Sequence, residues 1–173
     1  MPELPEVETT VRAIDKFENH ILEEIIIHNR NLRWKVETKV QSLTKRKLVV
    51  KITRRAKYIL IYLDDNCLMI HLGMSGKLRI QNNADNYFKK HDHAELIFKN
   101  EKIVFNDVRK FGSIHLSKNP QKHRLIKNLG VEPLSRAFNK FYLKNICENS
   151  NLCIKKLIMD QKYVVGVGNI YAS

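Results

Sequence analysis

Cysteine is scarce in this sequence, which limits the kinds of site that the chain can form. Its three cysteines, Cys67, Cys147 and Cys153, are odd in number and include no C-x-x-C pair. We therefore expect reduced thiols in a cytosolic protein and no zinc site built from these residues. Long apolar runs are also missing, since the longest have only the length of a strand. The sequence predicts neither a membrane-spanning segment nor a signal peptide.

Acidic residues are few compared with basic ones. The 173 residues include 31 Lys and Arg but only 18 Asp and Glu, which gives a formal net charge of +13. Because 43% of the residues are hydrophobic, we expect a folded core rather than a basic tail. So large a positive charge favours a polyanionic partner, most often nucleic acid. Ribosomal and other RNA-binding proteins share this property, so charge alone does not separate them from enzymes that act on DNA.

The N-terminal residues combine an amine with a carboxylic acid. A small second residue such as Pro2 generally allows removal of the initiator methionine, which leaves a secondary amine at the N-terminus. An α-amino group has a pKa near ~8, against ~10.4 for lysine, so more of it is unprotonated at neutral pH. An amine beside an acid such as Glu3 is the pair that imine chemistry requires. The same stretch also fits an ordinary surface helix that begins near Pro5 and buries one apolar face.

Short β-branched and aromatic runs predict a β-rich domain in the first two thirds of the chain. We expect strands at 21–28, 67–70, 94–98, 103–105 and 113–116, and a strand pair at 47–63 with a basic interruption at 54–57. Trp34 is expected to fill a core near the first strand. Roughly six to eight short strands separated by turns indicate a sandwich or a barrel.

Beyond residue 117 the apolar pattern changes from the period of a strand to that of a helix. We predict a helix that is capped by Ser135 and contains Phe138 and Ile146, a second helix over about 151–159, and a third that Asn169 caps. The predicted fold is α+β, in three parts. These are an N-terminal helix and antiparallel β-sandwich domain over 1–117, a linker over 118–134, and an incomplete helix–two-turn–helix domain over 135–173.

Two glycine-containing loops are candidate binding elements. In 73–76 two glycines flank Met74 and Ser75, which predicts either a loop that displays Met74 or a tight turn that buries it. In 165–169 a Val-Gly-Val-Gly-Asn turn between helices would expose backbone N–H groups, which is one way to bind a phosphate. Glycine turns between helices are common, so the second pattern is weak on its own.

Six segments together give the sequence a close resemblance to a known family. They occupy residues 2–9, 54–58, 71–76, 91–93, 106–112 and 159–173. In order and spacing they resemble the bacterial formamidopyrimidine-DNA glycosylases, a family that also contains endonuclease VIII. At Leu4, Met74, Arg109 and Phe111 the chain resembles the formamidopyrimidine branch rather than the endonuclease VIII branch. The resemblance covers the whole chain and implies a base-excision repair enzyme that removes oxidised purines, such as 8-oxoguanine and formamidopyrimidines.

The resemblance also implies a mechanism and its catalytic residues. Pro2 would attack C1′ of the damaged nucleoside and form a Schiff base, and Glu3 would open the sugar ring. Lys57 would act in β-elimination and contact the backbone phosphate. Successive β- and δ-elimination at the abasic site would then cut the strand.

Further residues are implied as DNA contacts. Met74 and Arg109 would fill the space left by an everted nucleotide, and Phe111 would wedge between base pairs. The remaining expected contacts are His91, Lys155 and Asn169. Two positions depart from the family pattern: Val108 stands where proline is usual, and Ser150 where a DNA-contacting lysine is frequent.

Family members continue beyond the last residue of this chain. The resemblance implies that the continuation holds further helices and a four-cysteine zinc finger, so we expect no cofactor or metal in this chain itself. The expected partner is double-stranded DNA with oxidised purines or abasic sites, bound by a monomer in the bacterial cytoplasm, at the nucleoid. The chain is expected to have impaired activity without that continuation. The competing hypothesis is an inactive glycosylase remnant that binds DNA through charge alone.

Overall fold

The computed structural model describes residues 1–85 and 87–173. Helix α1 (Leu4–Ile14) opens the chain, has Pro5 in its first turn and leads into the short helix η1 (Asp15–Phe17). The Glu6 carboxylate accepts the Glu3 N–H at 2.9 Å, which satisfies a backbone donor at the start of the helix. The buried side chains of α1 are those of Leu4, Val7, Val11 and Ile14. The predicted amphipathic helix is confirmed.

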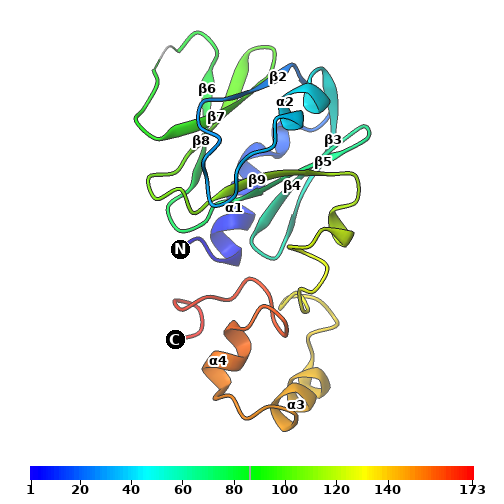
Figure 1. The fold of residues 1–173 in the computed structure, drawn as a ribbon. Helices are drawn as coiled ribbons and strands as arrows, with labels where there is room; N and C mark the ends of the chain where they lie inside the picture. Colours follow the sequence, from blue (N-terminus) through cyan, green and yellow to red (C-terminus); the bar gives the residue numbers. More distant parts are fainter. Residues whose placement is uncertain (86) are drawn as a thin grey trace.

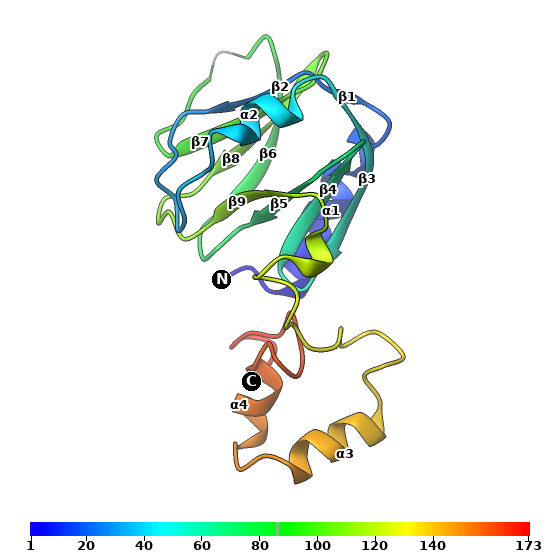
Figure 2. The ribbon, with the colours of Figure 1, turned by 45° about the vertical axis from the view of Figure 1, so that its right-hand side comes forward.

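In the described part of the chain, nine strands form two antiparallel sheets. The first sheet has the order β1 (Ile21–Leu22), β3 (Lys47–Arg55), β4 (Tyr58–Leu63), β5 (Cys67–His71) and β9 (Ser113–Ser117). The second has the order β2 (Glu24–Ile27), β7 (Asp92–Ile97), β8 (Glu101–Asn106) and β6 (Lys77–Asn82). Side chains from both sheets and α1 share one buried cluster, which includes Leu68, Leu96 and Phe105. This is the predicted sandwich, and Figures 1 and 2 show it at one end of the molecule.

The region around the first strand differs from its prediction in three ways. The apolar run at 21–28 is two strands rather than one, because β1 pairs with β3 while β2 pairs with β7 of the other sheet. A short helix, α2 (Lys39–Thr44), lies beside β2 and was not predicted. Trp34 does not fill the core: it is half-buried at the surface, with the guanidinium groups of Arg33 and Arg124 over its ring.

The C-terminal part contains two helices, α3 (Lys140–Glu148) and α4 (Ile154–Met159), which Figure 1 shows below the sandwich. Asn139, rather than Ser135, caps α3, since its side chain accepts the N–H groups of Phe141 and Tyr142. Buried Ile146, Leu157 and Val164 form a separate small core in this part. The third predicted helix is only a turn over 169–172. In the ranges 1–85 and 87–173, no helix is long and apolar enough to cross a bilayer.

The segment between the two parts is ordered and attached to the sandwich. It contains the short helix η2 (Pro120–Lys122), and its residues Ile126 and Leu129 pack on the outer face of the first sheet, near Leu60 and Met69. The Glu132 carboxylate then forms ion pairs with Arg54 at 2.7 Å and Arg55 at 3.0 Å. It also accepts the backbone N–H of Ala56 at 2.7 Å. Glu132 therefore fixes the start of the C-terminal part to the β3–β4 turn.

These contacts make the stability contributed by Glu132 depend on pH. Burial alone would raise its pKa, but the Ala56 N–H and the two guanidinium groups outweigh burial and lower the pKa from 4.5. The unfolded chain then binds the proton more readily, so the stabilisation is present above pH 4.5 and is lost as pH falls through the folded-state pKa.

Replacing Glu132 tests this attachment. Glu132→Gln should lower the free energy of unfolding by roughly 1–3 kcal/mol at neutral pH, because the guanidinium groups lose their charged partner. In denaturant titrations at about pH 3 the difference from the wild-type chain should shrink, since the carboxylate is then protonated. Glu24→Gln, on exposed β2 surface, is the control and should change stability little at either pH. An equal loss for Glu132→Gln at both pH values would contradict the assignment.

Candidate active site

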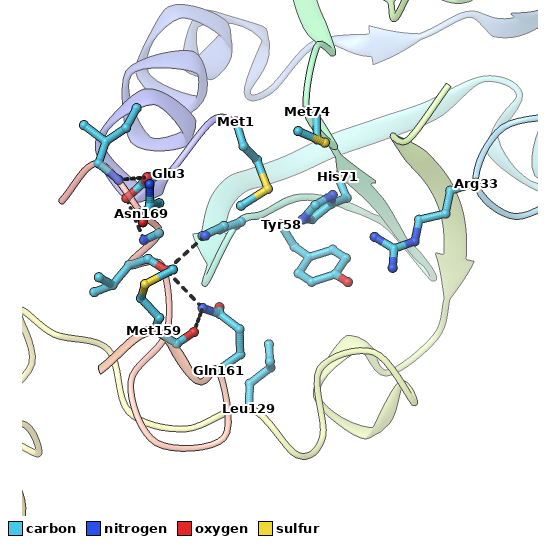
Figure 3. A pocket seen from close by; sticks show the side chains of 14 residues that line it. Met1, Glu3, Arg33, Tyr58, His71, Met74, Leu129, Met159, Gln161 and Asn169 are labelled. Atoms are coloured by element: carbon cyan, nitrogen blue, oxygen red, sulfur yellow. Dashed lines mark hydrogen bonds between the residues drawn. The ribbon is translucent and has the colours of Figure 1, made fainter. Parts of the chain in front are cut away.

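A cleft of about 620 Å³ lies where the N-terminus and the sandwich meet the C-terminal part. Its walls come from the residues before α1, from the β3–β5 hairpins and from the end of α4 and the turn that follows it. Figure 3 shows Met1 and Met74 on one side of it, with Gln161 and Leu129 on the opposite side. Glu3, Lys57 and Asn169, which the sequence predicts as functional residues, all line this cleft.

Glu3 is almost completely buried and connects the two halves of the chain. Its carboxylate accepts the backbone N–H groups of Gly168 at 2.6 Å, Ile170 at 2.9 Å and Tyr171 at 3.3 Å. A Cβ at Gly168 would lie 2.5 Å from this carboxylate, so only glycine allows so close an approach. The predicted capping role of Asn169 is therefore wrong, because a residue distant in sequence occupies that position. Asn169 itself is exposed at the rim of the cleft.

Lys57 brings a buried amine to the same cleft. The tight turn before it depends on Ala56, whose φ of 53° lies in the left-handed region. The Lys57 side chain is 6% exposed, and its Nζ donates to the Val167 carbonyl at 3.1 Å. Burial lowers the pKa of Lys57, while the nearby carboxylates of Glu3 and Glu6 oppose that change. A lysine in this setting can exchange a proton more readily than an exposed one.

Pro2 does not line the main cleft but lies immediately beside it. It lines an adjoining cavity of about 330 Å³ together with Glu6, Thr10 and Met74, among others. Met1 is half-exposed and lines the main cleft. While Met1 is present, the Pro2 nitrogen belongs to a peptide bond and is not basic.

The three predicted space-filling residues lie together. Met74 and Phe111 are each 42% exposed, and the Arg109 guanidinium lies 4.9 Å from the centre of the Phe111 ring. All three line a third cavity, which also touches Met1. Of the two predicted alternatives for Met74, the displayed loop is the one observed.

The other two predicted DNA contacts lie outside these cavities. His91 is half-buried at the base of the Arg109 loop, where its carbonyl accepts the Asp107 N–H. Lys155 is exposed on α4, and its Nζ donates to the Ser173 hydroxyl at 2.7 Å. Both therefore present polar groups to solvent on the parts that border the cleft, without contacting Glu3 or Lys57.

Three residues that line the cleft were not assigned a role from the sequence: Arg33, Tyr58 and His71. Tyr58 and His71 face each other across β4 and β5, with their rings 4.7 Å apart. Burial, Arg33 and Lys57 lower the pKa of His71 to about 4, so its ring is neutral at neutral pH. Since its Nδ1 accepts the Gly73 N–H at 3.0 Å, Nε2 carries the hydrogen. The turn at 64–66 sets the register of this hairpin, so the pairing of Tyr58 with His71 was predictable.

The described residues provide no group of three or more His, Cys, Asp or Glu side chains that could share a metal ion. Cys67 is buried, whereas Cys147 and Cys153 are exposed. Burial raises the pKa of the Cys67 thiol to about 12, so it is protonated at neutral pH. The side chains that line the cleft include the carboxylate of Glu3, the amine of Lys57 and the guanidinium of Arg33.

Known proteins resemble this chain in both sequence and structure. Residues 1–114 match the formamidopyrimidine-DNA glycosylase N-terminal domain, and residues 129–173 match the H2TH domain of the same proteins. The formamidopyrimidine-DNA glycosylases of Cronobacter sakazakii and Legionella pneumophila are 45% and 46% identical to the entire chain. The chain spans 64% of the length of each.

Two solved structures of the Lactococcus lactis protein Fpg share the fold. One, in complex with DNA containing an abasic site, has a TM-score of 0.87 and 32% identity over 98% of this chain. The other, a mutant with DNA containing Fapy-dG, has a TM-score of 0.88 and 33% identity over 99% of this chain. This chain covers 64% of both proteins. The fold, the matched domains and these relatives show that the chain belongs to the formamidopyrimidine-DNA glycosylase family.

Proposed function

We propose that this chain carries the catalytic residues of a DNA glycosylase and abasic-site lyase for oxidised purines, with Pro2 as the nucleophile. The observation that carries the proposal is the buried pair of Glu3 and Lys57 beside the N-terminus. The neighbouring exposed group of Met74, Arg109 and Phe111 supports it. The names of the similar structures add support, since those proteins are bound to DNA with an abasic site or Fapy-dG.

The first chemical step forms a covalent bond to the sugar. Once Met1 is removed, the Pro2 nitrogen attacks C1′ of the everted nucleoside, and the bond from C1′ to the base breaks. The Pro2 nitrogen loses its proton as it bonds to C1′, and Glu3, the next residue in the chain, can take up this proton. The carboxylic acid so formed delivers the proton to the ring oxygen as the sugar opens. The product is a Schiff base between the proline nitrogen and C1′.

The following steps break the DNA strand. Loss of a proton from C2′ expels the phosphate at C3′, and a second elimination expels the phosphate at C5′. Lys57 suits the first elimination because its lowered pKa increases the share of neutral amine that can accept a proton. The Nε2–H of His71 and the guanidinium of Arg33 supply donors for a phosphate in the same cleft.

Eversion of the nucleotide needs groups that replace it in the stack. Unstacking a base costs a few kcal/mol, and an apolar wedge can offset part of this cost. Phe111 and Met74 provide exposed apolar surface for this purpose, and Arg109 can donate hydrogen bonds to the unpaired base on the opposite strand. If the chain is instead a remnant that binds DNA through charge alone, the apolar side chains of Met74 and Phe111 would not matter, and Arg109 would contribute only its charge.

The preference for lesion-containing over intact DNA distinguishes the glycosylase from a remnant that binds through charge alone. At fixed salt, a duplex with a tetrahydrofuran abasic-site analogue should bind about tenfold or more tightly than the intact duplex, because the filling residues insert only at the lesion. Phe111→Ala should reduce this preference while leaving the salt dependence unchanged, since it removes no charge. Lys155→Ala is the matched control. It should weaken binding to both duplexes equally and reduce the salt dependence of binding. Equal affinity for the two duplexes at every salt concentration would support the charge-only remnant instead.

A further inference from the structure

The loop that carries Met74 and the loop that carries Arg109 meet at one buried carboxylate, Asp107. The first loop joins β5 to β6 and the second joins β8 to β9. Figures 1 and 2 show both connections at the end of the sandwich where the N-terminus lies. Asp107 has no solvent-exposed surface. No Lys, Arg or His side chain of the described residues forms an ion pair with it.

The Asp107 carboxylate makes hydrogen bonds to both loops. Its Oδ1 accepts the hydroxyl hydrogen of Ser75 at 2.5 Å and the Arg109 N–H at 3.3 Å. Its Oδ2 accepts the Gly112 N–H at 2.7 Å. The Ser75 hydroxyl oxygen in turn accepts the Arg109 N–H at 3.1 Å. The side chains of Ser75 and Asp107 thus connect the residue after Met74 to both ends of the segment that contains Arg109 and Phe111.

The backbones of the two loops are also in direct contact. A Cβ at Gly73, where φ is +64°, would overlap the backbone of Phe111. A Cβ at Gly112 would lie 2.5 Å from the Phe105 ring and 3.0 Å from Asp107 Oδ2. The loops therefore share a backbone contact at Gly73 and Phe111 in addition to the hydrogen bonds at Asp107.

A buried carboxylate without a cationic partner is costly to desolvate, and hydrogen bonds offset only part of that cost. Here the carboxylate sets the geometry of the two loops through its hydrogen bonds to Ser75, Arg109 and Gly112. We propose that Asp107 and Ser75 are positioning residues that form a latch, so that Met74, Arg109 and Phe111 move as one unit. The consequence for DNA rests on the proposed function: the latch lets the three side chains enter a lesion together. The coupling of the loops is a property of the free protein.

Hydrogen exchange in the free protein tests the coupling without DNA. Ser75→Ala should raise amide exchange at Arg109 and Gly112 about tenfold or more, although Ser75 lies on the other loop, because a charge-assisted hydrogen bond is lost. Asp107→Asn should raise exchange in both loops, since its amide presents a donor where an acceptor is needed. Ser75→Thr keeps the hydroxyl and should restore protection. Asp85→Asn, which removes the same charge from an exposed position, should have no effect on either loop. Unchanged exchange at Arg109 and Gly112 in Ser75→Ala would overturn the latch.

Binding to the two duplexes then tests its consequence. Ser75→Ala should lower the preference for the tetrahydrofuran duplex about tenfold at fixed salt, with an unchanged salt dependence. In a Phe111→Ala background the same substitution should have a smaller effect, because the two residues then act on the same step. If Ser75→Ala raised amide exchange in the loops but kept the full preference for the tetrahydrofuran duplex, Ser75 would not be a positioning residue. If the wild-type chain bound the tetrahydrofuran duplex and the intact duplex equally well, the proposed function would be contradicted. The hydrogen-exchange measurements on the free protein would still test the latch by themselves.

Discussion

A chain that retains Met1 should form no covalent adduct with abasic-site DNA, whereas the same chain treated with methionine aminopeptidase should form one. With Met1 in place the Pro2 nitrogen is an amide, whose lone pair is delocalised into the carbonyl group. After cleavage it is a secondary amine, of which roughly a tenth is neutral at pH 7, against well under ~0.1% of an ordinary lysine. Borohydride trapping followed by denaturing electrophoresis should therefore show the adduct only after treatment, because the α-amine of the untreated chain belongs to Met1, one residue before the position of the nucleophile.

Binding must be measured beside trapping, because Met1 also lines the cleft. The tetrahydrofuran analogue has no aldehyde and cannot be trapped, so it reports binding alone. The two forms of the chain should bind that duplex with similar affinity at the same salt concentration. Equal trapping by both forms would mean that Pro2 is not required as the nucleophile. The α-amine of Met1 and the buried amine of Lys57, both of which line the cleft, would then be the candidates.

Glu3→Gln should have the second largest effect, because Glu3 has both a chemical and a structural role. A glutamine can neither take the proton from Pro2 during the attack nor deliver it to the ring oxygen, so base excision from an 8-oxoguanine duplex should fall by about 10²- to 10⁴-fold. Its amide also offers only one carbonyl oxygen to the N–H groups of Gly168, Ile170 and Tyr171. The free energy of unfolding should fall by roughly 1–3 kcal/mol as these bonds weaken.

Two readouts separate the roles of Glu3. Single-turnover excision measures the proton transfer, and denaturant unfolding measures the attachment of the C-terminal turn. Glu132→Gln is the matched control, since it also weakens that attachment but lies outside the cleft. It should lose stability with little loss of excision rate. If Glu3→Gln lost stability but kept its excision rate within about threefold, Glu3 would be a structural connector only.

Local patterns in the sequence predicted much of the fold. The spacing of Val7, Val11 and Ile14 after Pro5 was enough to predict α1, because it requires only one face of one helix. The turn at 64–66 between two apolar runs likewise predicted the hairpin of β4 and β5. The run at 21–28 was misjudged because the chain passes from one sheet to the other within it, and strand periodicity carries no information on which sheet a residue joins.

Several residues of the candidate site were predicted from the sequence, but the contacts between them were not. Pro2, Glu3, Lys57 and the space-filling residues follow from the resemblance to the family. The contact of Glu3 with Gly168 could not be predicted, since these residues are 165 positions apart and no local pattern links them. The bond from Ser75 to Asp107 is a further example, because it joins two loops that only the packing of the sandwich brings together.

The central claim is that the amine of Pro2, and no lysine, attacks the sugar. The most direct measurement is to trap the aminopeptidase-treated chain on abasic-site DNA with borohydride, digest the complex and locate the modified residue by mass spectrometry. We predict a single modified peptide that begins with Pro2 and carries the sugar remnant on its N-terminal nitrogen. A remnant on Lys57, or the absence of an adduct from a chain whose N-terminus is verified as Pro2, would contradict this account.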